Sequence, residues 1–252
     1  MPYTINKDSL TTKVFESRSS MGLDAANLVS EKISELLKTR PFVNMIFAAA
    51  PSQNDFLDEL VNKDIEWSRI NAFHMDEYVG LDANAPQGFG NFLKERLFKK
   101  VSFHSVQYLN GNAEDLEAEC DRYADLLRLQ PADIVCMGIG ENTHLAFNDP
   151  HVADFNDPKV VKIVDLDMEC RQQQVNDGCF GTIEAVPTYA LTLTVPALVK
   201  ATYVYCMVPG EKKAKAVYHT LNEDITEKHP STILRQHSNA TLFIDEKSSV
   251  LI

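Results

Sequence analysis

The residue types best suited to proton chemistry begin with two adjacent carboxylates, Asp76 and Glu77, which directly follow the apolar run RINAFHM. Neighbouring residues at the end of a strand point in different directions, so one carboxylate can face a cleft while the other binds the scaffold. A carboxylate at the lip of a dry cleft has a raised pKa and can act as a general base. The alternative is a capped turn with two solvated acids.

A second candidate segment is GIGENTHLAFNDP, residues 138–150, which also follows an apolar run. It places His144 close in sequence to Asn142 and Asp149. A histidine with amide and carboxyl neighbours can shuttle protons, since its ordinary pKa is about 6.5. The alternative is a structural histidine that hydrogen-bonds the loop. The segment lacks the third glycine of a dinucleotide-binding loop, so no nicotinamide site is expected.

Two further segments offer partners for an anion. Residues 48–55, AAAPSQND, run from a strand into a helix, where free N–H groups and the hydroxyl of Ser52 can act as donors. A plain helix cap by Ser52 is the alternative. Residues 208–217, VPGEKKAKAV, place Lys212 and Lys213 at the start of a helix, where cations oppose the helix dipole. That placement indicates a bound anion, and the alternative is a solvated lysine pair.

These segments need a scaffold, and the chain alternates strand-like and helix-like patterns over its whole length. Strands are predicted at 43–50, 69–75, 133–140, 160–166, 190–195, 202–210 and 241–246, and helices at 21–37, 53–61, 89–98, 114–129 and 211–219. This alternation predicts one Rossmann-like α/β domain over residues 1–252, with three layers and a largely parallel sheet. Ligands of such folds bind outside the carboxyl ends of the strands, where all four segments are expected to meet.

The composition of the chain excludes several classes of binding partner and cofactor. The 252 residues carry 24 Lys+Arg and 36 Asp+Glu, a net charge of −12, which argues against nucleic-acid backbones and acidic membrane surfaces. The five scattered cysteines and seven histidines show no disulfide or zinc spacing, so no metal is expected. We expect no organic cofactor either. No secretion signal or bilayer-spanning run is evident, so we expect a cytoplasmic protein. The oligomeric state, a homo-oligomer included, stays open.

Together the motifs resemble the glucosamine-6-phosphate deaminase (isomerase) family, in collinear order from about Ala48 to the C-terminus. The shared segments are MDEYVGL at 75–81, LNGNAEDLEAEC at 109–120, GIGENTHLAFNDP at 138–150, VPTYALTLTV at 186–195 and PGEKKAKAV at 209–217. The same superfamily contains 6-phosphogluconolactonase. That branch carries Asp-Glu-Arg where this chain has Asp-Glu-Tyr at 76–78, and it lacks the Ala-Phe-Asn found here at 146–148.

The resemblance implies a reaction in which an amino-sugar phosphate and water give a ketose phosphate and ammonia. It implies that Asp76 moves a proton from C2 to C1, that His144 assists ring opening, and that Asp149 orients the histidine. The substrate- or phosphate-binding positions that it implies are Ala50, Ser52, Gln53, Thr143, Arg171 and Lys213. Arg171 is only the nearest candidate for the family's mid-chain phosphate arginine, which has no gapless match.

Three departures from the family pattern bear on this assignment. Asn142 stands where the family has an aspartate, and Thr143 replaces a glycine. The family's Gly-Gly phosphate loop is Ala-Ala-Pro-Ser here, at 49–52, and its two Cβ atoms make positive φ costly, so the loop is expected to take another path. If the missing charge at Asn142 is uncompensated, Asn142→Asp is expected to speed turnover of a cyclic substrate.

The sequence therefore predicts an amino-sugar phosphate deaminase/isomerase that acts on a small-molecule sugar phosphate. One alternative is a lactonase-like sugar-phosphate hydrolase. Another is a sugar-phosphate-binding protein that lost ring opening together with the aspartate. Release of ammonia separates the first hypothesis from the other two.

Overall fold

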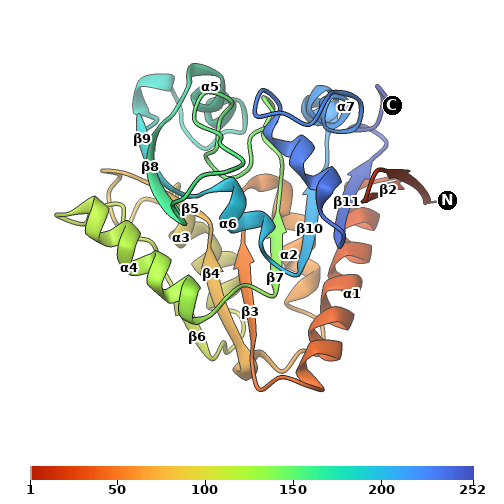
Figure 1. Cartoon of the computed structure of the whole chain (residues 1–252), viewed down its shortest axis with the longest axis horizontal. Coiled ribbons are helices and arrows are strands. Elements are labelled where there is room, and N and C mark those ends of the chain that lie inside the picture. The colour runs from red at the N-terminus through yellow and green to blue at the C-terminus, as the bar shows by residue number, and fades with distance from the viewer. Residues whose placement is uncertain (1) are drawn as a thin grey trace.

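The central strands bury both of their faces, as their apolar sequences predict. In β3 (Val43–Phe47), Met45 and Phe47 belong to one hydrophobic cluster and Ile46 to another. Successive side chains of a strand point to opposite faces, so helices must cover each face of the sheet. The computed structural model, which describes residues 2–252, has this three-layer arrangement (Figure 1).

The central sheet is largely parallel, which confirms the predicted Rossmann-like α/β class. Its strands lie in the order β1 (Tyr3–Lys7), β2 (Leu10–Phe15), β11 (Ala240–Asp245), β10 (Tyr203–Val208), β7 (Ile134–Met137), β3, β4 (Ile70–His74) and β6 (Ser105–Gln107). The hairpin of β1 and β2 is antiparallel, and every other neighbouring pair is parallel.

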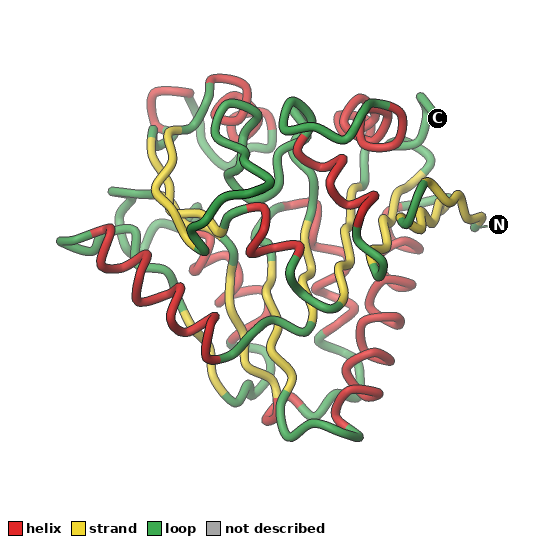
Figure 2. Tube along the Cα trace, viewed as in Figure 1, coloured by secondary structure: helices red, strands yellow, loops and turns green. Residues whose placement is uncertain are grey.

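Two groups of helices cover the two faces of this sheet. One face carries α1 (Arg18–Leu37), α2 (Asn54–Leu60) and α3 (Phe89–Leu93), the last prolonged by a turn of π-helix to Phe98. The other face carries α4 (Leu116–Leu129), α6 (Val195–Val199) and α7 (Ala214–Asn222). A further helix, α5 (Met168–Asn176), lies beyond the tips of the strands, at the top of the view in Figures 1 and 2.

A smaller antiparallel sheet takes up two of the predicted strands. It joins β5 (Asp76–Tyr78), β9 (Tyr189–Leu193) and β8 (Val161–Asp165), and Asp76 pairs with Thr192. The strands expected at 160–166 and 190–195 therefore exist but do not belong to the parallel sheet. Their shared sheet gives β5 a pairing partner, so it fixes the backbone that carries Asp76.

The sequence analysis did not predict the hairpin of β1 and β2, the short elements β5, β6 and α6, or helix α5. The hairpin and α5 were missed because their sequences carry weak signals. The hairpin of β1 and β2 has an exposed first strand, and its turn depends on Asp8, whose φ is 52°. Helix α5 reads MECRQQQVN and has few apolar residues to repeat at helical spacing. Its start is fixed instead by Asp167, whose carboxylate accepts a hydrogen bond from the N–H of Cys170 at 2.6 Å.

The register of the central strands brings their carboxyl ends to one level. Phe47 of β3 pairs with His74 of β4 and with Cys136 of β7, and Met137 of β7 pairs with Cys206 of β10. The four segments singled out in the sequence follow these four strands. They therefore begin at the same edge of the sheet, as the prediction required.

Gly111 supports the strand that carries Asp76. The N–H of Gly80 donates to the carbonyl of Gly111 at 3.1 Å, and a Cβ at Gly111 would lie 1.8 Å from the carbonyl oxygen of Tyr78. We predict that Gly111→Ala lowers the free energy of unfolding by about 1–3 kcal/mol in urea denaturation, because rigid backbone must move. Gly181→Ala is the control, since a Cβ there meets nothing within 4 Å. Equal stability of the two variants would contradict this account.

Candidate active site

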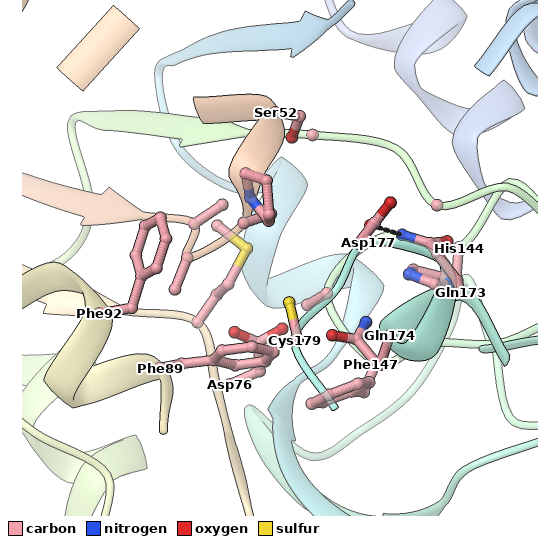
Figure 3. Close-up of a pocket in the computed structure, with 18 of the residues that line it drawn as sticks. Ser52, Asp76, Phe89, Phe92, His144, Phe147, Gln173, Gln174, Asp177 and Cys179 are labelled. Carbon is pink, nitrogen blue, oxygen red and sulfur yellow. Dashed lines mark hydrogen bonds between the residues drawn. The ribbon is translucent and has the colours of Figure 1, made fainter. Parts of the chain in front are cut away.

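A cavity of about 350 Å³ opens at the carboxyl edge of the central sheet, and all four post-strand segments line it. They contribute Ala50 and Ser52 after β3, Asp76 after β4, His144 after β7 and Lys213 after β10. Figure 3 shows Ser52 at one end of this cavity, with Asp76 and His144 on other walls. The sequence thus located five side chains of one cavity.

Asp76 and Glu77 divide their roles as the sequence analysis anticipated. Asp76 lines the cavity and is 6% exposed. Burial, with the nearby Glu77 carboxylate, raises the pKa of Asp76 well above its ordinary value of 3.8. Glu77 instead accepts hydrogen bonds from the backbone N–H groups of Tyr78, Phe89 and Gly90 at 2.8–3.0 Å, which ties β5 to α3.

The sequence analysis missed His74, which holds the backbone of Asp76 from behind. The N–H of Leu109 donates to His74 Nε2 at 3.0 Å, so the proton lies on Nδ1, which donates to the carbonyl of Asp76 at 2.9 Å. Burial lowers the pKa of His74 and keeps the ring neutral. A histidine two residues before a cleft carboxylate, within a buried strand, is the signal that would have indicated this role.

His144 reaches the cavity on a loop that requires a glycine at position 140. A Cβ at Gly140 would lie 2.2 Å from Cε1 of the His144 ring, so the ring packs directly on the Gly140 backbone. His144 Nδ1 lies 2.7 Å from Asn142 Oδ1 and 3.0 Å from Asp149 Oδ1. A proton on Nδ1 can be donated to both oxygens, and Nε2 is then available to a ligand.

Asp149 is the fully buried carboxylate of this network, at 0% exposure. Burial alone would raise its pKa, but the hydrogen bonds from His144 and Asn142 outweigh burial, and the pKa is lowered. Asp149 is therefore an anion that can offset a positive charge on His144. It supplies the orienting carboxylate although its side chain is one methylene shorter than the family's glutamate.

Asn142 joins the histidine to two carboxylates. Its Oδ1 lies against His144, and its Nδ2 donates to Asp149 Oδ1 at 3.0 Å and to Asp167 Oδ2 at 3.2 Å. An aspartate at 142 would lose both donations and set three carboxylates side by side. The loop therefore places the Asp149 carboxylate next to the histidine although residue 142 carries no charge.

Lys213 brings a positive charge into the cavity without a protein anion to pair with it. It is 8% exposed, and its ammonium group makes no hydrogen bond or ion pair with residues 2–252. Burial lowers its pKa, and the more distant carboxylates of Asp177 and Glu141 act in the opposite direction. A buried cation without a partner is costly, so this end of the cavity favours an anionic ligand.

Three candidate binding residues do not line the cavity. Gln53 Nε2 donates to the carbonyl of Met207 at 3.2 Å, and Thr143 Oγ1 donates to the carbonyl of Asn142. Arg171 donates to the carbonyls of Ile183 and Val186 at 2.7 and 3.0 Å, so its guanidinium fastens a turn beside α5. The structure leaves Lys213 as the cation that lines the cavity among the described residues.

The two unusual loops take the paths that their sequences dictate. Ala50 is extended, with φ at −154°, so the 49–52 loop avoids the left-handed region as expected. Thr143 has a φ of 73°, a conformation that suits the glycine of the family motif and strains a β-branched residue. Ala146 in the same loop also has a positive φ, at 51°, so the His144 loop holds two strained residues.

The sequence analysis also missed the wall that covers the cavity. Polar groups come from α5 and the turn after it, and they are Gln173, Gln174, Asp177 and Cys179. Aromatic rings come from Phe89, Phe92 and Phe147, of which Phe147 lies beside Gln174 and the other two lie further to the left (Figure 3). Because α5 itself has no apolar repeat, its glutamines carried no signal of a site.

Two side-chain groups have the spacing of metal ligands. His144, Asp149 and Cys170 form one, and Asp149, His151 and Asp167 form the other, each with ligand atoms within 4.8 Å. Both share Asp149, whose oxygen already accepts hydrogen bonds from His144 and Asn142. Burial, with the nearby Asp149 carboxylate, raises the pKa of the Cys170 thiol well above its ordinary value, which disfavours the thiolate that a metal requires.

The fold and the cavity together define an α/β enzyme whose reactive groups lie at the carboxyl edge of the sheet. Residues 16–243 match the family described as glucosamine-6-phosphate isomerases/6-phosphogluconolactonase. Over 216 residues the chain is 35% identical to a glucosamine-6-phosphate deaminase of Bacillus cereus (strain B4264), covering 86% of this chain and 80% of the relative. The chain belongs to this family.

Solved structures agree with that assignment. The chain resembles a monomeric glucosamine-6-phosphate deaminase with a TM-score of 0.87 and 28% identity, over 96% of this chain and 99% of the other. It resembles a 6-phosphogluconolactonase from Thermotoga maritima with a TM-score of 0.76 and 19% identity, over 94% of this chain and 100% of the other. The second likeness shows a shared fold alone.

The amide network predicts the effect of Asn142→Asp. Because the change sets an added carboxylate against Asp149 and Asp167, we expect the free energy of unfolding at neutral pH to fall by about 1–3 kcal/mol. We also expect turnover to slow because His144 loses its alignment. This reverses the acceleration expected for an uncompensated loss. The double variant with Asp167→Asn is the control and should recover most of the stability; faster turnover in Asn142→Asp would overturn this interpretation.

Proposed function

We propose that this chain is an amino-sugar phosphate deaminase/isomerase, which converts glucosamine 6-phosphate or a close relative and water into a ketose phosphate and ammonia. The observation that carries the proposal is one cavity that holds Asp76, His144 and the unpaired Lys213. The curated relatives that are 34–35% identical bear the name glucosamine-6-phosphate deaminase. We further propose a cytoplasmic location, which the five free thiols support.

In this proposal His144 opens the sugar ring. Its Nε2 takes the proton of the anomeric hydroxyl and returns a proton to the ring oxygen, which breaks the bond between the anomeric carbon and that oxygen. The imidazolium formed in between is stabilised by the buried anionic Asp149, 3.0 Å from Nδ1. Asn142 keeps the ring in position through its own Oδ1.

Asp76 then acts on the open chain. As a carboxylate it removes the proton from C2 and returns it at C1, while the C1 oxygen gains a proton and the amino nitrogen loses one. The amino aldehyde thereby becomes the imine of a ketose, with a hydroxyl on C1. Water adds to the C2 carbon of that imine, and ammonia leaves. The water-poor setting that raises the pKa of Asp76 also raises its strength as a base.

Measurement of ammonia and ketose phosphate from a panel of amino-sugar phosphates tests this function. Production of both products at equal rates is the expected result. Hydrolysis of a sugar-phosphate lactone without ammonia release would instead select the lactonase-like alternative. Binding of sugar phosphates without turnover would select the non-catalytic alternative.

We predict that Asp76→Asn lowers kcat by about 10²–10⁴, because the general base is lost. In the wild type, activity should rise with pH as Asp76 ionises, at a pKa above 3.8. Asp125→Asn, on the exposed face of α4, is the control and should keep full activity. Near wild-type kcat in Asp76→Asn would remove this residue from the mechanism.

Asp76→Asn should also change how the stability of the protein depends on pH. Folded Asp76 holds its proton more tightly than the unfolded chain does, so ionisation of this group costs stability as pH rises above 3.8 through the folded-state pKa. Asp76→Asn escapes that cost. Its melting temperature relative to wild type should therefore increase with pH over this range, and a constant difference would contradict the raised pKa.

Lys213→Met is predicted to raise KM for the phosphorylated substrate by about 10–100-fold, because a hydrogen bond to a charged group is lost. The KM of the unphosphorylated amino sugar should change little. Lys212→Met is the matched control, since Lys212 Nζ donates to the carbonyl of Asn176 and does not line the cavity. Equal changes in KM for both sugars would show that Lys213 does not bind the phosphate.

A further inference from the structure

Gln174 is a buried residue whose side-chain amide has no hydrogen-bond partner among the described residues. Its side chain lines the cavity and the residue is 8% exposed. Its backbone carbonyl accepts the N–H groups of Cys179 and Phe180 at 3.0 and 3.4 Å. Its side-chain amide makes no hydrogen bond with residues 2–252 and is accessible from the cavity. Figure 3 shows the amide beside Cys179 and near the Phe147 ring.

The two preceding residues show what an amide does when it is structural. Gln172 is exposed, and its Nε2 donates to Asn176 Oδ1 at 3.1 Å. Gln173 is buried, and its Oε1 accepts the N–H of Glu141 at 2.8 Å while its Nε2 donates to Asp177 Oδ2 at 3.4 Å. Gln174 is the member of this run whose donors and acceptor remain directed at the cavity.

An amide in the cavity wall that has no partner among the described residues is available to a polar group of the ligand, and such a hydrogen bond contributes about 0.5–1.5 kcal/mol. The amide is neutral and offers both an acceptor and donors. That combination matches a hydroxyl, which also donates and accepts. A phosphate is bound better by the positively charged ammonium of Lys213 than by a neutral amide. The apolar Phe147 ring and the Cys179 thiol beside it leave few competing partners.

The position of Gln174 in the cavity limits which hydroxyl of the substrate its amide can bind. In Figure 3, Asp76 and Gln174 lie in the lower part of the view and Ser52 at the top. With C2 of the substrate at Asp76 and the phosphate towards Ser52, C3 and C4 follow C2 along the sugar chain. Gln174 lies at the same end of the cavity as Asp76, so the hydroxyls on these two carbons are the ones assigned to its amide.

We propose that Gln174 is a specificity-determining residue that hydrogen-bonds a secondary hydroxyl, on C3 or C4, of the amino-sugar phosphate. This inference rests on the proposed function and adds the part of the substrate that the cavity recognises. A site that hydrogen-bonds a hydroxyl discriminates against an analogue that lacks it, because the buried amide is then left unpaired.

The test compares Gln174→Leu with Gln172→Leu on three substrates: glucosamine 6-phosphate, its C4 epimer galactosamine 6-phosphate, and 3-deoxyglucosamine 6-phosphate. We expect Gln174→Leu to lower kcat/KM on glucosamine 6-phosphate about tenfold. The wild-type preference for this sugar over one of the two analogues should shrink by the same factor, and that analogue identifies the hydroxyl. Gln172→Leu should change neither quantity.

The melting temperature of Gln174→Leu should stay close to that of the wild type, because the amide makes no hydrogen bond with residues 2–252 that the substitution would remove. Gln174→Met, which keeps the unbranched shape, provides a second variant if the first does not fold. An equal loss of kcat/KM on all three sugars would overturn the proposal, because a merely structural role has that signature. Unchanged kcat/KM in both variants would overturn it as well.

Failure of the proposed function gives a different result. In that case the wild type releases no ammonia from any of the sugars, and the same three compounds are compared by calorimetric binding. A lost preference in Gln174→Leu would then still support hydroxyl recognition, and an unchanged ratio of dissociation constants would overturn it. Absence of binding by the wild type would overturn both proposals together.

Discussion

The level register of four parallel strands is the constraint on which the rest of the site depends. β3, β4, β7 and β10 end at one height because Phe47 pairs with both His74 and Cys136, and Met137 pairs with Cys206. A parallel strand cannot shift by one residue without turning its buried side chains to the wrong face. The burial of both faces therefore fixes where each reactive segment starts, before any of its own residues are considered.

Around that edge, burial acts in opposite directions on the two charged groups of the cavity. It raises the pKa of Asp76 and lowers that of Lys213, so burial disfavours the charged form of each. Asp149, equally buried, stays anionic because two side chains donate to it. The difference shows how the site is organised: the orienting carboxylate is satisfied by the protein, whereas the groups that face the ligand are left for the ligand to satisfy.

Some of the residues of the site could be predicted from the local sequence, and others could not. Apolar runs followed at once by polar residues located Asp76, His144 and Lys213. A continuous apolar run predicts a strand that is buried on both faces, and the polar residues mark where that strand ends. Arg171 could not be placed in that way, since its hydrogen bonds go to carbonyls twelve and fifteen residues away. The partner of His74 could not be predicted for a related reason, since the N–H that fixes its tautomer belongs to Leu109, thirty-five residues away.

The amide of Asn142 also has an evolutionary consequence. Its Nδ2 lies between Asp149 and Asp167, and Asp167 in turn begins α5 through the N–H of Cys170. Asparagine can serve as a helix cap as well as aspartate does, so position 167 is free to lose its charge. A lineage that regains aspartate at 142 is then expected to hold a neutral residue at 167, and the two positions should exchange charge together across relatives of this chain.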